Sequence, residues 1–206
     1  MSEQSILVKN YVNSKIRHLC KSPNEASTKA ILAKARRGIG KAPGSLSELW
    51  ALTLADMPEA LLGKTGEPSY GEWAAYIGLT LFSLHQQGKD LKTQCMNCEG
   101  EKLGLVLRKL ISVDDDEHRI KHRFDAVVTA SSMEEISHHL RGLIQLLKIR
   151  NIPLDYPALA EDLYLFQLSS VRDSVCLRWG RDFYRSPINR DKNEDRIGKD
   201  ENNGEK

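Results

Sequence analysis

Several features that would mark a membrane-spanning, secreted or metal-dependent protein are missing from this sequence. No run of about 18 apolar residues is present, which excludes a helix that could span a bilayer. Residues 1–15 have neither the cationic start nor the apolar centre of a signal peptide. Of the four cysteines only Cys95 and Cys98 form a Cys-x-x-Cys pair, whereas a structural zinc site usually needs a second pair. We therefore expect a cytoplasmic protein with reduced thiols, no membrane contact, no metal and no cofactor.

Catalytic patterns are also scarce. The GKT triplet at residues 63–65 lacks the preceding glycine of a P-loop, and no strand is predicted before it. His138 and His139 are adjacent and cannot share one helix face, and neither HExxH nor GxSxG occurs. His85 ends an apolar stretch, so we expect a packed or capping histidine. The sequence thus favours a binding protein over an enzyme. In an enzyme, the Cys-x-x-Cys pair and the GKT triplet would be the only candidate sites.

The charges are unevenly distributed, although the net charge is only +2. Residues 1–45 carry nine Lys and Arg against two acidic residues, whereas residues 46–135 carry nine against fifteen. A basic end on a nearly neutral protein indicates a localised surface for a polyanion.

Helical periodicity extends along most of the chain, and the period of two that is typical of strands never persists. The sequence therefore predicts an all-α protein. In the clearest helix, Ser132-x-x-Glu135 is a capping-box pattern. Another helix carries Trp73, Ile77 and Leu81 on what we expect to be a single buried stripe. The helices are expected over residues 3–20, 24–37 or 27–37, 70–87, 101–112, 117–130, 132–150, 155–168 and 170–185, with short helical pieces within 43–69.

The polar stretch at residues 88–100 predicts a boundary between two packed helical bundles. The first bundle would comprise residues 1–90 and the second residues 91–185. Residues 186–206 are highly charged and almost free of apolar side chains, so we expect a disordered tail there.

The run KARRGIGK at residues 34–41 concentrates cations at the end of a predicted helix. Gly38 and Gly40 are expected to end the helix and to let a phosphate backbone approach closely. Cations in a last helical turn also complement the helix dipole, which is a purely structural explanation. The cations of this run are Lys34, Arg36, Arg37 and Lys41.

Two further helical edges carry cations for which we expect no acidic partner one turn later. Arg119 and Arg123 share one flank of an apolar face, and Lys121 lies on the other flank. Arg141 and Lys148 are seven residues apart and so lie on one side of their helix. Cations beside an apolar seam also commonly lay their stems on the core, which leaves a structural alternative open.

The motifs KARRGIGK, EWAAYIGLTLFSLHQQ, LGLVLRKL, HRFDAVVTASSMEEISHHLRGLIQLLK and IPLDYPALAEDLYLF follow one another in an order that resembles the CasB family. These proteins are the small subunit of Cascade, the type I-E CRISPR surveillance complex. The resemblance covers about residues 28–185. It implies an all-α fold of two packed helical bundles without catalytic activity.

The resemblance also implies the partners: other Cascade subunits, a second copy of the chain, guide RNA and target DNA, notably its displaced strand. Base pairing would read the sequence, while the protein contacts the phosphate backbone. Matched motifs place family cations on Arg37, on Lys89 and Lys92, on Arg123 and on Arg141. The predicted nucleic-acid-binding residues are Lys34, Arg36, Arg37, Lys41, Lys89, Lys92, Arg119, Lys121, Arg123 and Arg141.

A second function remains open at this stage, namely a free-standing DNA-binding regulator with residues 119–150 as a helix-turn-helix pair. Its second helix, however, lacks the early cluster of Asn, Gln and Arg that reads base edges in such proteins.

Overall fold

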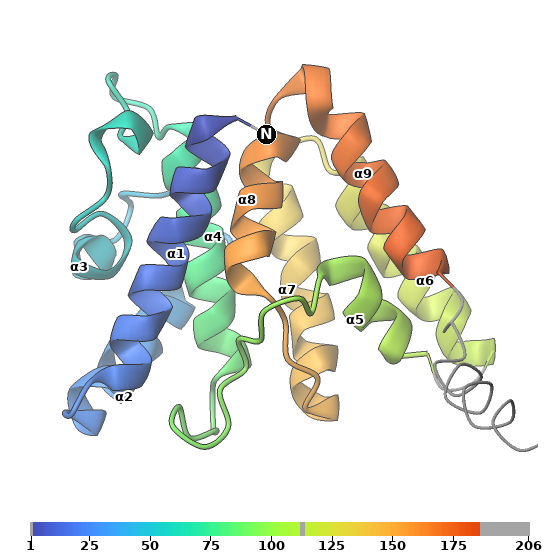
Figure 1. Ribbon diagram of the computed structural model, residues 1–206, viewed down its shortest axis with the longest axis horizontal. Coiled ribbons are helices and arrows are strands. Elements are labelled where there is room, and N and C mark those ends of the chain that lie inside the picture. The colour runs from blue at the N-terminus through green and yellow to red at the C-terminus, as the bar shows by residue number, and fades with distance from the viewer. Residues whose placement is uncertain (1, 112–113, 186–206) are drawn as a thin grey trace, which may run out of the picture.

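The computed structural model describes residues 2–111 and 114–185, and within these ranges it contains helices and no strand beyond one isolated bridge between Asn97 and Leu154 (Figure 1). The all-α prediction is thereby confirmed. The tail predicted at residues 186–206 lies outside the described residues. The α-helices are α1 (Glu3–Lys21), α2 (Glu25–Ala35), α3 (Trp50–Thr53), α4 (Tyr70–His85), α5 (Leu103–Lys109), α6 (Asp114–Thr129), α7 (Met133–Arg150), α8 (Tyr156–Phe166) and α9 (Ser169–Tyr184), and the short 3₁₀ turns are η1 (Arg36–Gly38), η2 (Ser47–Leu49) and η3 (Glu59–Leu61).

Helix α4 lies at the centre of the molecule, where it packs against α1, α2, α7 and α8. The sequence predicts one buried stripe on this helix, but every residue from 74 to 86 is buried. The predicted stripe is therefore too narrow, and Trp73 at its beginning is only half-buried. A helix covered by four neighbours has no solvent side, so its small residues become buried as well.

Local hydrogen bonds allow α4 to be buried in this way. At its beginning Ser69 and Glu72 form a complete capping box, with Ser69 Oγ accepting from Glu72 N at 3.0 Å. Within the helix the hydroxyls of Thr80 and Ser83 each donate to the carbonyl four residues earlier, at 2.8 Å. These two buried hydroxyls are thus satisfied within the helix itself.

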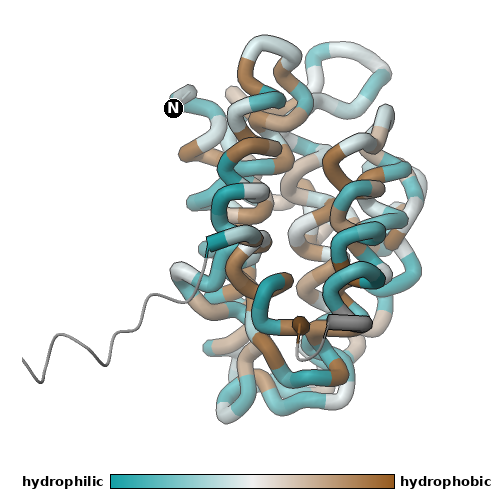
Figure 2. Tube along the Cα trace, turned by 90° about the vertical axis from the view of Figure 1, so that its right-hand side faces the viewer, coloured by the Kyte–Doolittle hydropathy of each residue, from teal (hydrophilic) through white to brown (hydrophobic). Residues whose placement is uncertain are grey.

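The remaining helices enclose α4 from both halves of the chain. Helix α1 packs along α8, α6 pairs with α7, and α9 covers α5 and α8. Figure 2 shows hydrophobic and hydrophilic residues alternating along the helical turns, as in helices that bury one side. The division at residues 88–100 stays a prediction, and one continuous hydrophobic core extends across it.

The loop between α4 and α5 is held at both ends although its sequence is polar. Buried Gln86 donates to the carbonyls of Lys89 and Gln94 and accepts from the backbone N–H of Met96. At the far end Asp155, which caps α8, also accepts from the backbone N–H of Gly100 at 2.8 Å. The cations of this loop are therefore presented on a fixed backbone.

The close contact between α5 and α9 generates a test of the packing. A Cβ atom at Gly104 would lie 2.3 Å from the carbonyl oxygen of Trp179, which is backbone that cannot move aside, whereas at Gly180 it would meet nothing within 4 Å. We expect Gly104→Ala to destabilise the fold by about 1–3 kcal/mol. Gly180→Ala, the matched control in a helix interior, should stabilise it by about 0.5–1 kcal/mol. Urea unfolding of both variants measures the difference, and equal effects would show that α5 and α9 do not pack this closely.

Candidate nucleic-acid interface

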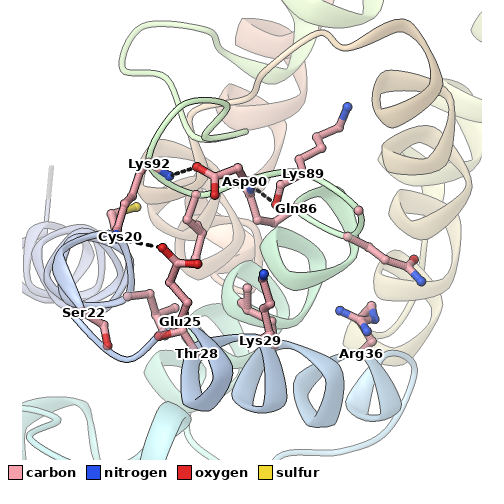
Figure 3. A pocket seen from close by; sticks show the side chains of 15 residues that line it. Cys20, Ser22, Glu25, Thr28, Lys29, Arg36, Gln86, Lys89, Asp90 and Lys92 are labelled. Atoms are coloured by element: carbon pink, nitrogen blue, oxygen red, sulfur yellow. Dashed lines mark hydrogen bonds and ion pairs between the residues drawn. The ribbon is translucent and has the colours of Figure 1, made fainter.

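A cleft of about 380 Å³ lies between α2 and the loop that follows α4 (Figure 3). Its lining includes acidic Glu25 and Asp90 together with four cations from both sides of the opening. We call this the basic cleft. The four cations are Lys29, Arg36, Lys89 and Lys92.

The end of α2 directs Arg36 into the basic cleft. Thr28, Leu32 and Ala35 bury one side of α2, and Arg36 follows as its C-cap residue. The side chain is half-buried, and this burial lowers the pKa of its guanidinium. Arginine nevertheless keeps its charge in proteins, so Arg36 presents a partly desolvated cation.

The two glycines of KARRGIGK have different roles. Gly38 is buried, and a Cβ there would lie 2.4 Å from the hydroxyl oxygen of Tyr76, which donates to the Gly38 carbonyl at 3.0 Å. The expectation that Gly38 admits a phosphate backbone is therefore wrong, because α4 occupies that space. Gly40 has φ of 78° and is exposed, so it alone forms the open left-handed turn.

The cations of this run do not all face the basic cleft. Arg37 turns toward η2, where its Nη2 lies 2.7 Å from Glu48 Oε2, and 61% of its side chain remains exposed. Lys34 and Lys41 are exposed. Successive residues in a helical turn point about 100° apart, which separates Arg36 from Arg37.

Lys89 and Lys148 extend the charge from the basic cleft to α7. The Lys89 ammonium contacts the side-chain oxygen of Asn151, and Lys148 Nζ donates to Gln87 Oε1 at 2.9 Å. Burial lowers the pKa of Lys148, and the nearby positive charges of Arg36 and Lys89 lower it further. Three elements thus bring three cations close together.

Lys92, in contrast, is paired across the basic cleft. Its Nζ lies 2.9 Å from Glu25 Oε1, and this hydrogen bond raises the pKa of Lys92. Both side chains are about half exposed, so the pair adds little stability and can exchange for another anion.

Arg141 and Arg123 continue the positive surface along α7. Arg141 is exposed two helical turns before Lys148, about 10 Å away on the same side. A Cβ at Gly142 would lie 3.0 Å from Arg123 Nη1, so the Arg123 guanidinium crosses from α6 onto α7. Gly142 thereby has a guanidinium beside it.

We call the five cations that lie on α7 or beside it the basic strip. Sequence reasoning missed Lys29 in the cleft and left Lys148 out of its predicted set, because their neighbours are more than 50 residues away along the chain. The members of the basic strip are Arg36, Lys89, Lys148, Arg141 and Arg123.

The other predicted cations of α6 lie outside this strip. Lys121 Nζ is 2.6 Å from Asp125 Oδ2, so the expectation that no acid lies one turn later is wrong for Lys121. Exposed Arg119 lines a separate hollow of about 40 Å³ together with Arg150.

The cysteines and His85 are the other residues that the sequence analysis singles out. Cys95 lies near Cys20 rather than Cys98, and no group of three or more His, Cys, Asp and Glu within residues 2–111 and 114–185 is placed to hold a metal ion. His85 is buried, as expected, with its Nδ1 2.9 Å from the Tyr156 hydroxyl. None of the helices described here is long and apolar enough to cross a membrane.

Comparisons with known proteins identify relatives of this arrangement. The family model for CRISPR-associated protein Cse2 matches residues 31–184. Among solved structures, CasB from Thermobifida fusca is 31% identical with a TM-score of 0.73, covering 87% of this chain and 98% of its own. CasB from Thermus thermophilus is 21% identical with a TM-score of 0.63, covering 89% and 99%. CasB from M. ruber is 20% identical with a TM-score of 0.58, covering 91% and 98%. A comparison with curated protein sequences gives no match.

The buried histidine beneath the basic strip predicts a pH dependence of stability. Burial lowers the pKa of His85 to about 4, and the charges of Lys89 and Lys148 add to this effect. The unfolded chain binds a proton near pH 6.5, so stability is complete above about pH 6.5 and is lost as the pH falls toward 4. The loss should reach up to about 3 kcal/mol.

Urea unfolding between pH 4 and 7.5 measures this loss, with His85→Gln as the comparison. The variant should be less stable at pH 7.5 because it loses the contact with Tyr156, but its stability should fall less steeply between pH 6.5 and 4. Identical slopes would assign the acid sensitivity to other groups.

Proposed function

Because this chain belongs to the CasB (Cse2) family of CRISPR-associated proteins, we propose that it is the non-catalytic small subunit of a type I-E Cascade complex and holds target DNA by its phosphate backbone. Family membership supports a role as a Cascade subunit. The nucleic-acid contacts proposed below rest on the geometry of the basic strip.

The observation that carries the proposal is that the cations of the basic strip come from separate elements. Arg36 and Lys89 come from α2 and the loop after α4, Lys148 and Arg141 from α7, and Arg123 from α6. Cations from separate elements that converge on one side can follow a chain of phosphates, whereas a single cationic helix turn merely complements its own dipole.

The chemistry of the strip favours backbone contacts over base reading. Guanidinium and ammonium groups bind phosphate oxygens by charge-assisted hydrogen bonds and carry no sequence information there. In an RNA-guided complex base pairing reads the sequence, so such a surface is sufficient. We propose that the strip holds the displaced strand of the opened target.

The predicted cations outside the basic strip are proposed as additional phosphate contacts. Exposed groups can rearrange toward phosphate, and the surface ion pairs of Arg37, Lys92 and Lys121 are of the kind that contributes little to folding. Guide RNA, the remaining Cascade subunits and a second copy of the chain are proposed partners. These additional candidates are Lys34, Arg37, Lys41, Lys92, Arg119 and Lys121.

Charge reversal in the strip tests the proposal in the assembled complex. Arg36→Glu and Arg141→Glu should each accelerate target dissociation by at least about tenfold, because a contact between charged groups becomes a repulsion. The displaced strand should also become more reactive toward permanganate. Arg181→Glu, at an exposed arginine of α9, is the matched control and should leave both quantities unchanged.

Melting of the isolated variants separates binding from folding. Substitution of exposed Arg123 or Arg141 should change stability by about 0.5 kcal/mol or less. Unchanged dissociation and reactivity in Arg36→Glu, Arg123→Glu and Arg141→Glu would reject the site. A large loss of melting temperature would instead assign these arginines to folding.

Salt dependence tests the mode of binding. The isolated protein should bind single-stranded DNA weakly, with a slope of log affinity against log salt of about −0.7 per phosphate contacted. Arg141→Glu should reduce this slope by about one contact. A flat salt response, or a strong preference for one duplex sequence, would favour the alternative of a free-standing helix-turn-helix regulator.

A further inference from the structure

Two half-buried thiols meet beside the basic cleft. Cys20 lies in the last turn of α1, and Cys95 lies in the loop between α4 and α5. Their sulfur atoms are 3.7 Å apart although 75 residues separate them in the sequence. A disulfide bond needs about 2.05 Å between the sulfurs, so an approach of less than 2 Å would join them.

The surroundings of the thiols favour a disulfide between Cys20 and Cys95 over one between Cys95 and Cys98. The Cys98 thiol is exposed and lies 3.8 Å from the carbonyl oxygen of Glu99, whereas Cys95 accepts from or donates to Cys20. Cys20 also lines the basic cleft, next to the pair formed by Lys92 and Glu25 (Figure 3). A small molecule in the cleft can therefore reach Cys20, and Cys95 beside it is itself only half-buried.

We propose that Cys20 and Cys95 are a redox-active pair that forms a reversible disulfide by exchange with a low-molecular-weight disulfide such as oxidised glutathione. The bond would tie the loop that carries Lys89 and Lys92 to the end of α1. Neither thiol is needed for the proposed binding of phosphate, so this chemistry can be tested separately.

The exchange follows from the unequal acidity of the two groups. The hydrogen bond from Cys20 lowers the pKa of Cys95 to about 7, and the same contact raises the pKa of Cys20. The Cys95 thiolate attacks one sulfur of the small disulfide, which forms a mixed disulfide and releases one thiolate. Cys20 then loses its proton to solvent and attacks the Cys95 sulfur, releasing a second thiolate. The two protein thiols lose two electrons and the small disulfide gains them.

Titration of the full chain with oxidised and reduced glutathione tests the pair. Alkylation followed by mass spectrometry should show a peptide joining Cys20 to Cys95, and two thiols lost per chain. The Cys98→Ser variant should behave in the same way. In the double variant Cys20→Ser/Cys98→Ser, Cys95 should stop at the glutathione adduct, because no neighbouring thiol remains to resolve it.

Two results would overturn the inference: a disulfide between Cys95 and Cys98, or four free thiols throughout the titration. Thermal melting adds a readout that is independent of nucleic acid. Oxidation should raise the melting temperature of Cys98→Ser by several degrees, since the bond closes a long loop of the unfolded chain. It should leave Cys20→Ser unchanged, and a rise in Cys20→Ser would contradict the assignment. Failure of DNA binding in the arginine variants would not affect any of these outcomes.

Discussion

Burial of α4 on every side is the constraint on which the rest of the structure depends. A helix with no polar face must be covered by neighbours from several parts of the chain, and here α1, α2, α7 and α8 supply the cover. The closeness of this packing is visible at Gly38, where the Tyr76 hydroxyl occupies the space of a side chain. Part of the basic strip follows from this arrangement, because α2 and α7, two of these neighbours, carry Arg36, Lys148 and Arg141.

Residues at the C-terminal end of α4 hold two cations of the basic strip, Lys89 and Lys148, in position. His85 and Gln86 are buried, and Gln86 holds the backbone of the loop that presents Lys89. Directly after them, exposed Gln87 accepts a hydrogen bond from Lys148 of α7. Core packing thus positions the candidate interface. The exposed cations do not depend on ion pairs to hold them in place.

The sequence predicts the helices well because their periodicity and caps are local. Ser132, for example, accepts from the backbone N–H of Glu135 as predicted, although the Glu135 carboxylate reaches Ser131 instead of completing the box. Contacts between distant segments are not encoded locally. The pairing of Lys92 with Glu25, the position of Lys148 near Arg36 and the approach of Cys20 to Cys95 all arise from tertiary packing. The family resemblance supplied Arg123 and Arg141, but the approach of the Arg123 guanidinium to Gly142 required the structure.

Site-specific crosslinking would test the central claim most directly, because it reports where DNA lies. Gln145 is exposed on α7 between Arg141 and Lys148, whereas Leu177 on α9 is 54% exposed and lies outside the strip. A photoreactive residue at each position can be introduced into an assembled complex bound to its target. The account predicts that position 145 crosslinks to the displaced strand and position 177 does not. Crosslinking at 177 without crosslinking at 145 would contradict it.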